Sequence, residues 1–339
     1  MRLSVLDQSP VPAGFTAADA LRNTIDLARV TDRLGYERYW IAEHHAIESL
    51  ASPAPEILLA RIGCETSGIR IGSGAVLLPH YSPMKVAEIF RMLEALYPGR
   101  VDLGVGRAPG GTALETYALR RERSGPPSSV DDFPQQLLEL MAFLKGEFPA
   151  RHPFAQIHLT PEAAGIPEIW MLGSSMWSAS AAAQLGLPYA FAHFIDQQPT
   201  RSALEYYRAH FVPTGERRAP RQIVAIGVVC ADTEAEARRL VSSSRLLIRR
   251  IRRGERGPVP TPEEAVAALD STPDPMPPVP SEFPRYIVGD PEQVRERLIE
   301  MASRLGLDEL MVVTITHDHR ARVRSYELLA EALELDPRG

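Results

Sequence analysis

The sequence has little cysteine and no excess of positive charge. Two of its 339 residues are cysteine, Cys64 and Cys230, and their spacing matches no metal-binding or redox motif. This usage argues against a disulfide scaffold and fits a reducing cytosol, so we expect a cytoplasmic protein. Lysine and arginine total 37 against 43 acidic residues, which gives a net charge of −6. Nucleic acid is therefore not an expected partner.

Long apolar runs are also missing. No stretch approaches the roughly 20 apolar residues that a membrane helix needs. The opening MRLSVLDQSP lacks the apolar core of a signal peptide, so we expect no membrane association. The first strand-like run leads into DQSPVPAG, which contains no G-x-G-x-x-G turn. A dinucleotide-binding open sheet is disfavoured for that reason.

Short apolar runs alternate with longer helical patterns along the chain. The predicted strands are residues 3–7, 38–42, 69–78, 101–106, 167–173, 188–194, 222–231 and 308–315. Helix signals follow them, such as Thr16 before the first helix and Asp290 before the one that precedes the last strand. Eight strand–helix units predict an α/β fold, a single (β/α)8 TIM barrel over residues 1–339.

Two insertions interrupt this rhythm, after the fourth and the seventh strands. Residues 107–130 contain glycine, proline and arginine and are predicted to form a long loop. Residues 257–285 are dense in proline and are predicted to form an irregular, lid-like segment.

Polar residues cluster where the predicted strands end. The candidates are Glu43, His44, His45, His80, Tyr81 and His193. In a (β/α)8 barrel the carboxyl ends of the strands form one rim, and reactive groups collect there. Consecutive strand residues point in opposite directions, so only one of His44 and His45 need face the cavity. We expect the others to line a substrate pocket.

A second group has the chemistry of a phosphate site. Arg107 follows the fourth strand, and Ser174, Ser175 and Ser178 lie where the fifth strand gives way to a helix. A helix N-terminus offers free N–H groups and a partial positive charge. A guanidinium from the neighbouring strand end can bind phosphate through two hydrogen bonds. These residues predict a phosphate-bearing ligand.

Several longer stretches resemble the bacterial luciferase-like flavin-dependent monooxygenases, and the resemblance covers nearly the whole chain. They are GYERYWIAEHH, IRIGSGAVLLPHYSPMKVAE, YPGRVDLGVGRAPGG and AAAQLGLPYAFA. Within the family, the subgroup that tailors aromatic polyketides in antibiotic biosynthesis is the most similar, such as the luciferase-like enzyme of mensacarcin biosynthesis. The resemblance implies a (β/α)8 barrel that binds reduced FMN supplied by a separate reductase, or alternatively the deazaflavin F420.

The resemblance also implies an activity. The family oxygenates small organic substrates with O2 through a C4a-hydroperoxyflavin, and a transient flavin reductase and a homodimer are the expected partners. His44 matches the catalytic histidine, as general base or proton shuttle. Gly106 replaces the reactive cysteine of true luciferases, so light emission is not expected.

Cofactor residues follow from the same resemblance. Arg107, Ser174, Ser175 and Ser178 are expected to cradle the flavin phosphate, although Ser174 replaces an acidic residue of the luciferases. Members place a non-proline cis peptide under the flavin ring, and the corresponding bond joins Gly74 to Ala75.

Three alternatives remain open at this point: an F420-dependent oxidoreductase, a flavin-binding protein without catalysis, and a metal-dependent barrel hydrolase. The last would use His44, His45, His317 and His319, because zinc favours such ligands. The first strand lacks a His-x-His motif, and we predict no metal site.

Overall fold

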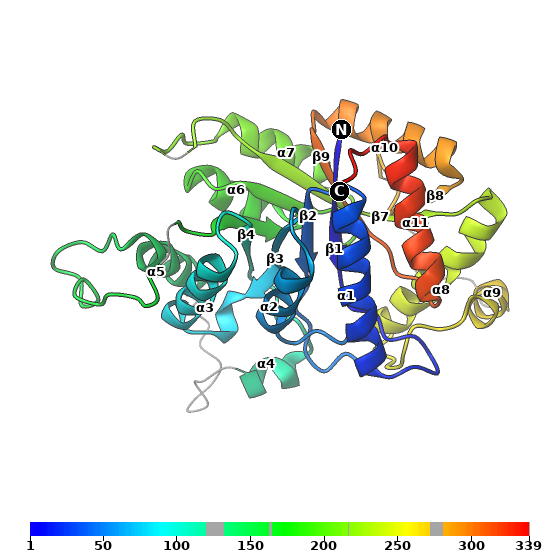
Figure 1. Ribbon diagram of the computed structural model, residues 1–339, viewed down its shortest axis with the longest axis horizontal. Coiled ribbons are helices and arrows are strands. Elements are labelled where there is room, and N and C mark those ends of the chain that lie inside the picture. Colours follow the sequence, from blue (N-terminus) through cyan, green and yellow to red (C-terminus); the bar gives the residue numbers. More distant parts are fainter. Residues whose placement is uncertain (120–131, 163–164, 216, 272–280, 339) are drawn as a thin grey trace.

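Eight parallel strands close into a barrel in the computed structural model, which describes residues 1–119, 132–162, 165–215, 217–271 and 281–338 (Figure 1). The barrel strands are β1 (Arg2–Asp7), β2 (Arg38–Ile41), β3 (Arg70–Leu77), β4 (Val101–Gly106), β5 (Glu168–Gly173), β6 (Tyr189–Ala192), β7 (Gln222–Cys230) and β9 (Glu309–Val313). They pair in sequence order, and β9 pairs with both β7 and β1. The predicted (β/α)8 barrel is confirmed.

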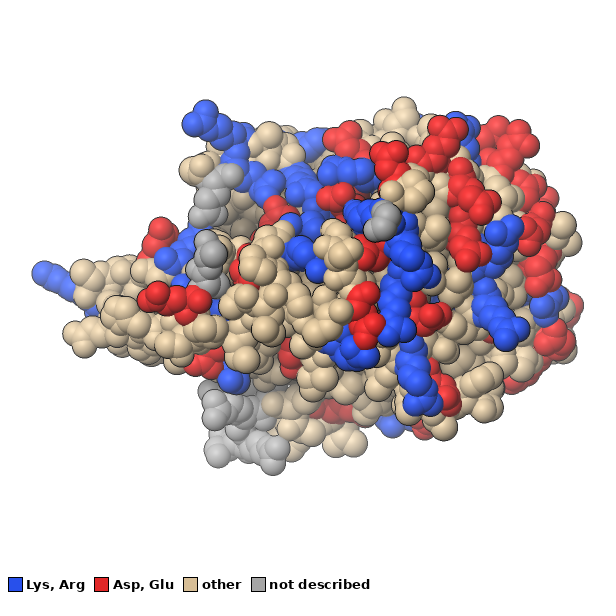
Figure 2. Space-filling model, in the orientation of Figure 1, with Lys and Arg blue, Asp and Glu red and all other residues tan. Residues whose placement is uncertain are grey.

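Helices surround this barrel (Figure 1). They are α1 (Ala17–Arg33), α2 (Pro55–Glu65), α3 (Pro83–Leu96), α4 (Ala113–Leu119), α5 (Phe133–Lys145), α6 (Met176–Gln184), α7 (Thr200–Ala209), α8 (Glu234–Arg252), α9 (Pro262–Ser271), α10 (Pro291–Leu305) and α11 (His319–Ala332). Thr16 and Asp290 cap α1 and α10, as predicted. Among the described helices, none is long and apolar enough to cross a membrane. Basic and acidic side chains are interspersed over the face shown in Figure 2.

The insertions lie after β4 and β7 as expected, but both contain structure that the sequence did not predict. A ninth strand, β8 (Tyr286–Gly289), pairs with the end of β7. Its four residues lie between Pro284 and the helix-capping Asp290, which left too short an apolar run to recognise. The last barrel strand is consequently β9.

The predictions of irregular structure were wrong in two places. Helix α9 occupies part of the 257–285 segment, because Pro262 lies at its first position, where proline is tolerated. Helix α4 occupies part of the predicted 107–130 loop. The rest of these two stretches includes residues 120–131 and 272–280, which lie outside the described residues.

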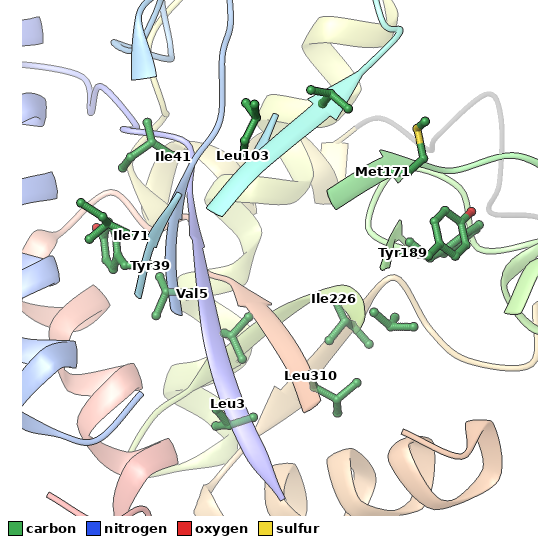
Figure 3. Packing of buried hydrophobic residues seen from close by; sticks show 14 of the residues in the cluster. Leu3, Val5, Tyr39, Ile41, Ile71, Leu103, Met171, Tyr189, Ile226 and Leu310 are labelled. Atoms are coloured by element: carbon green, nitrogen blue, oxygen red, sulfur yellow. The ribbon is translucent and has the colours of Figure 1, made fainter. Parts of the chain in front are cut away.

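Strand alternation divides the core into two layers. In β2, Tyr39 and Ile41 pack outward under the helices, whereas Trp40 belongs to the cluster inside the barrel. In β5, Met171 packs outward and Trp170 inward, where its ring meets that of Trp40 edge-on at 5.3 Å. Figure 3 shows labelled members of the outer layer on their strands. Bulky inward residues fill the barrel, so it is a packed core and not a pore.

Ion pairs close the end of the barrel where the strands begin. Arg38 is 1% exposed, and it donates to Asp102 at 2.6 Å and to Glu309 at 2.9 Å. A polar cavity of about 490 Å³ lies outside this network, and Arg38 and Glu168 are among its lining residues. Arg221 also lines it and pairs with Glu168 and Glu309. Because these arginines are paired with carboxylates, we assign this end to stability.

Replacing Arg38 tests that assignment. Arg38→Ala leaves Asp102 and Glu309 buried without their guanidinium partner, and breaking such a pair costs about 3–5 kcal/mol. We expect that loss of unfolding free energy in urea titration. Arg22→Ala is the control, because its partner Asp19 is on the surface. Equal, small effects of both variants would contradict a structural role for the buried network.

Candidate functional site

Glu43 organises the opposite rim, where the strands end. Its side chain is 1% exposed. Oε2 accepts from the Leu77 N–H at 3.1 Å, and Oε1 accepts from the Tyr81 hydroxyl at 2.8 Å. Oε1 also lies 2.7 Å from Nε2 of His45. Burial raises the pKa of Glu43, and these hydrogen bonds oppose that rise. The carboxylate thus ties the end of β2 to the end of β3.

His44 differs from its neighbour. Its backbone N–H donates to the Ser52 carbonyl at 2.9 Å. Its Nδ1 is buried, and within the described part of the chain it has no hydrogen-bond partner. Burial, and secondarily the nearby His45, lowers the pKa of His44 to about 4. The ring is therefore neutral near pH 7, and its Nδ1 is free of hydrogen bonds to the part of the chain that the structure describes.

The residues expected beneath a flavin ring, Gly74 and Ala75, lie in the second half of β3. The peptide bond between Gly74 and Ala75 is cis, as predicted. At Gly106, an added Cβ would come within 3.3 Å of the Ala75 Cβ. The missing side chain of Gly106 therefore keeps this part of the rim open.

Arg107 lies against the start of α6. Its guanidinium carbon is 4.3 Å from the ring centre of Trp177, the second residue of that helix. Ser175 caps the helix and is exposed, and Ser174 is half-buried. The guanidinium therefore stacks on the second residue of the helix that Ser175 caps, and a helix N-terminus with a guanidinium on its first turn could hold a phosphate group.

Ser178 has a different setting from the other two serines. It is 3% exposed, and its hydroxyl donates to the Ser175 carbonyl at 2.7 Å. Its Oγ also lies 3.0 Å from the Tyr189 hydroxyl. Ser178 therefore shapes the helix start from inside, and direct access to a ligand falls to Ser174 and Ser175.

His193 does not line an open pocket. Its side chain is 0% exposed, Nδ1 lies 2.7 Å from the Thr200 hydroxyl, and Nε2 lies 3.0 Å from the Pro284 carbonyl. Both ring nitrogens therefore connect the end of β6 to α7 and to the segment before β8. We leave His193 out of the pocket for that reason.

The histidines considered as zinc ligands are held by different partners. His317 Nε2 lies 2.9 Å from the Ala13 carbonyl, and His319 Nε2 lies 2.8 Å from Asp26. Across the described ranges, no three histidine, cysteine, aspartate or glutamate side chains form a group that could hold a metal ion. The geometry therefore gives the hydrolase alternative no support.

Two rim features escaped the sequence reasoning. Trp177 stacks on Arg107. Its position among the serines of SSMWSAS could have indicated that it lies at the predicted phosphate site. The backbone of the loop after β4 is also held by histidines: Pro109 O lies 2.9 Å from His80 Nε2, and Gly110 O accepts from the His45 N–H at 3.0 Å. Contacts of this second kind depend on distant segments and leave no local pattern.

Comparison with known proteins agrees with this geometry. The family model described as luciferase-like monooxygenase matches residues 1–309. A luciferase-like monooxygenase of Escherichia coli (strain K12) is 38% identical, over 98% of this chain and 96% of that protein. N-acetyl-S-alkylcysteine monooxygenase of Bacillus subtilis (strain 168) is 37% identical, over 98% of each chain. The crystal structure of apo-MsnO8 is 50% identical with a TM-score of 0.92, and covers 99% of this chain and 98% of its own.

The chain therefore belongs to the luciferase-like monooxygenase family and is an enzyme, which confirms the family predicted from the sequence.

The low pKa of His44 makes stability depend on pH. An unfolded histidine titrates near 6.5, whereas burial lowers the pKa of His44 to about 4. The unfolded chain binds more protons between these values, so stability is lost as the pH falls from about 6.5 to 4. This group alone accounts for a loss on the order of 3 kcal/mol.

We expect the ring resonances of His44 to stay those of a neutral imidazole down to about pH 5 in an NMR titration. His44→Phe should flatten the acid limb of the unfolding free energy between pH 6.5 and 4. A His44 that titrates near pH 6.5 in the folded protein would contradict the lowering of its pKa by burial.

Proposed function

We propose that this protein is the oxygenase of a two-component system, which uses reduced FMN from a separate reductase and O2 to oxygenate a small organic substrate. The observation that carries the proposal is the position of Arg107 beside the N-terminus of α6. That arrangement offers a phosphate site on the rim that also holds His44 at the end of β2.

The residues at hand divide the work of holding the cofactor. The Arg107 guanidinium and the Ser174 and Ser175 hydroxyls would bind the phosphate, with the first N–H groups of α6 behind them. Gly74 and Ala75 would support the ring from β3. The bound flavin supplies the chemistry of oxygen activation, and the protein orients it.

His44 is the proposed catalytic residue. Its ring is neutral near pH 7, because burial lowers its pKa to about 4. A neutral imidazole can accept a proton, and the buried Nδ1 has no partner of its own within the described chain. We assign it the transfer of a proton between the reacting atoms and the rim.

Exclusion of water is assigned to the segments over the rim. Val259, just before α9, exchanges backbone hydrogen bonds with Val11 and Ala13 of the loop after β1, at 2.8 and 2.9 Å. Arg256 pairs with Glu115 of α4 at 3.1 Å. The chain at the start of the 257–285 insertion is thus attached to the loop after β1 and, through Arg256 just before it, to α4, which suits a lid.

The proposal includes a homodimer and an aromatic substrate. Helices α2 and α3 expose large apolar side chains at Ile57 (69%), Met92 (52%) and Leu96 (60%), which suits burial in a homodimer. The sequence resemblance to the polyketide-tailoring subgroup favours an aromatic substrate.

Substitution of His44 separates binding from chemistry. His44→Ala should bind reduced FMN within about threefold of the parent, because the phosphate contacts lie elsewhere, and should lose roughly 100-fold or more in oxygenation. Anaerobic flavin titration and product analysis under O2 provide the two readouts. Product formation at the parental rate would show that His44 does not transfer the proton.

Substitution of Arg107 tests the phosphate site. Loss of a charge-assisted contact costs about 1.5–3 kcal/mol, so Arg107→Ala should weaken reduced FMN roughly 10- to 100-fold. Affinity for reduced riboflavin, which has no phosphate, should not change. Arg33→Ala, an exposed residue in the last turn of α1, is the control.

The same titrations with F420 compare the two cofactors. If Arg107→Ala loses affinity for reduced FMN and for reduced riboflavin to the same extent, or loses neither, the phosphate assignment is refuted. Tighter binding of F420 than of FMN by the parent protein would replace the oxygenase with a hydride-transfer enzyme.

A further inference from the structure

The buried carboxylate of Glu43 has no role in the function proposed above, although it lies one residue before His44. Three donors from two strand ends converge on it: Leu77 N–H, the Tyr81 hydroxyl and His45 Nε2. Burying a carboxylate is costly unless hydrogen bonds compensate, and each of these bonds holds its partner in one place.

His45 extends the network to the loop after β4. A carboxylate can only accept, so ionised Glu43 places the proton of His45 on Nε2 and fixes the orientation of its ring. The His45 backbone N–H donates to Gly110 O at 3.0 Å. One residue is thus bonded at its side chain to Glu43 and at its backbone to the loop.

His80 provides a second attachment to the same loop. Its Nε2 lies 2.9 Å from Pro109 O, and its ring meets that of His45 edge-on at 5.7 Å. The loop also approaches β3 closely: Gly110 has φ +67°, and a Cβ there would lie 2.1 Å from Leu77 Cδ1. A side chain at this position would displace the end of the Leu77 side chain, and the positive φ disfavours residues other than glycine.

We propose that Glu43 is a positioning residue that fixes Arg107 for the cofactor phosphate, acting through His45 and the Pro109–Gly110 backbone. Arg107 directly follows β4 and lies two residues before Pro109. Because the backbone at Pro109 and Gly110 is anchored, the positions open to the Arg107 guanidinium are limited. This inference rests on the proposed function, since it presumes that Arg107 binds phosphate. It also gives Glu43, His44 and His45 separate duties, with His44 alone facing the chemistry.

Glu43→Gln tests the proposal. The amide turns an –NH2 toward either Leu77 N–H or the His45 and Tyr81 donors, so at least one donor loses its acceptor. We expect affinity for reduced FMN to fall roughly 10-fold from the displaced guanidinium, and affinity for reduced riboflavin to stay unchanged. A general loss of structure would weaken both flavins equally. Glu48→Gln, at an exposed residue of the loop that follows β2, is the charge-matched control.

A double-mutant cycle with Arg107→Ala makes the test specific. If Glu43 acts through Arg107, then Glu43→Gln has no further effect on FMN affinity once Arg107 is alanine. Additive losses would overturn the proposal. His45→Phe, which keeps the ring against His80 and removes the bond to Glu43, should give the same FMN-selective loss. This second variant covers the case that Glu43→Gln does not fold.

The binding data distinguish the positioning role of Glu43 from the phosphate site itself. A parent protein that binds FMN and riboflavin equally would refute the phosphate site itself. A parent protein that binds FMN more tightly than riboflavin would support the phosphate site. If Glu43→Gln then loses affinity for both flavins to the same extent, or for neither, the positioning role is refuted.

Discussion

The hydrogen bonds between β1 and β9 impose the constraint on which the rest of the structure depends. Their register runs from Arg2 opposite Glu309 to Val5 opposite Val312, and it joins the first and last barrel strands. Closure of a parallel sheet brings every strand end to one rim. Residues from the ends of β2 and β4 and from the start of α6 therefore share one space, although the chain separates them widely.

Buried polar groups are compensated at one end of this barrel and left partly uncompensated at the other. Where the strands begin, Arg38 is matched by Asp102 and Glu309, so the charges compensate one another. Where they end, His44 Nδ1 is buried and has no hydrogen-bond partner among the described residues, and Ser175 is exposed at a helix start. Unused hydrogen-bonding capacity of this kind is suited to a ligand, and the packed interior between the ends keeps the two apart.

Much of this arrangement could be predicted from the sequence, because long apolar runs and strand-end positions are local signals. The barrel and the rim location of Glu43 and His44 were predicted in this way, whereas the cis bond at Gly74–Ala75 was predicted from the family resemblance. The remainder depended on distant partners. Strand β8 is too short to stand out, and the burial of His193 is set by Thr200 and Pro284.

The central claim is that a flavin phosphate binds between Arg107 and the N-terminus of α6, with its ring toward His44. A crystal structure of the protein with bound FMN tests it most directly. The account predicts phosphate density within hydrogen-bond distance of the Arg107 guanidinium and of Ser174 or Ser175, and the flavin ring over Gly74 and Ala75. Phosphate density at the other end of the barrel, or on the rim away from Arg107, would contradict the account.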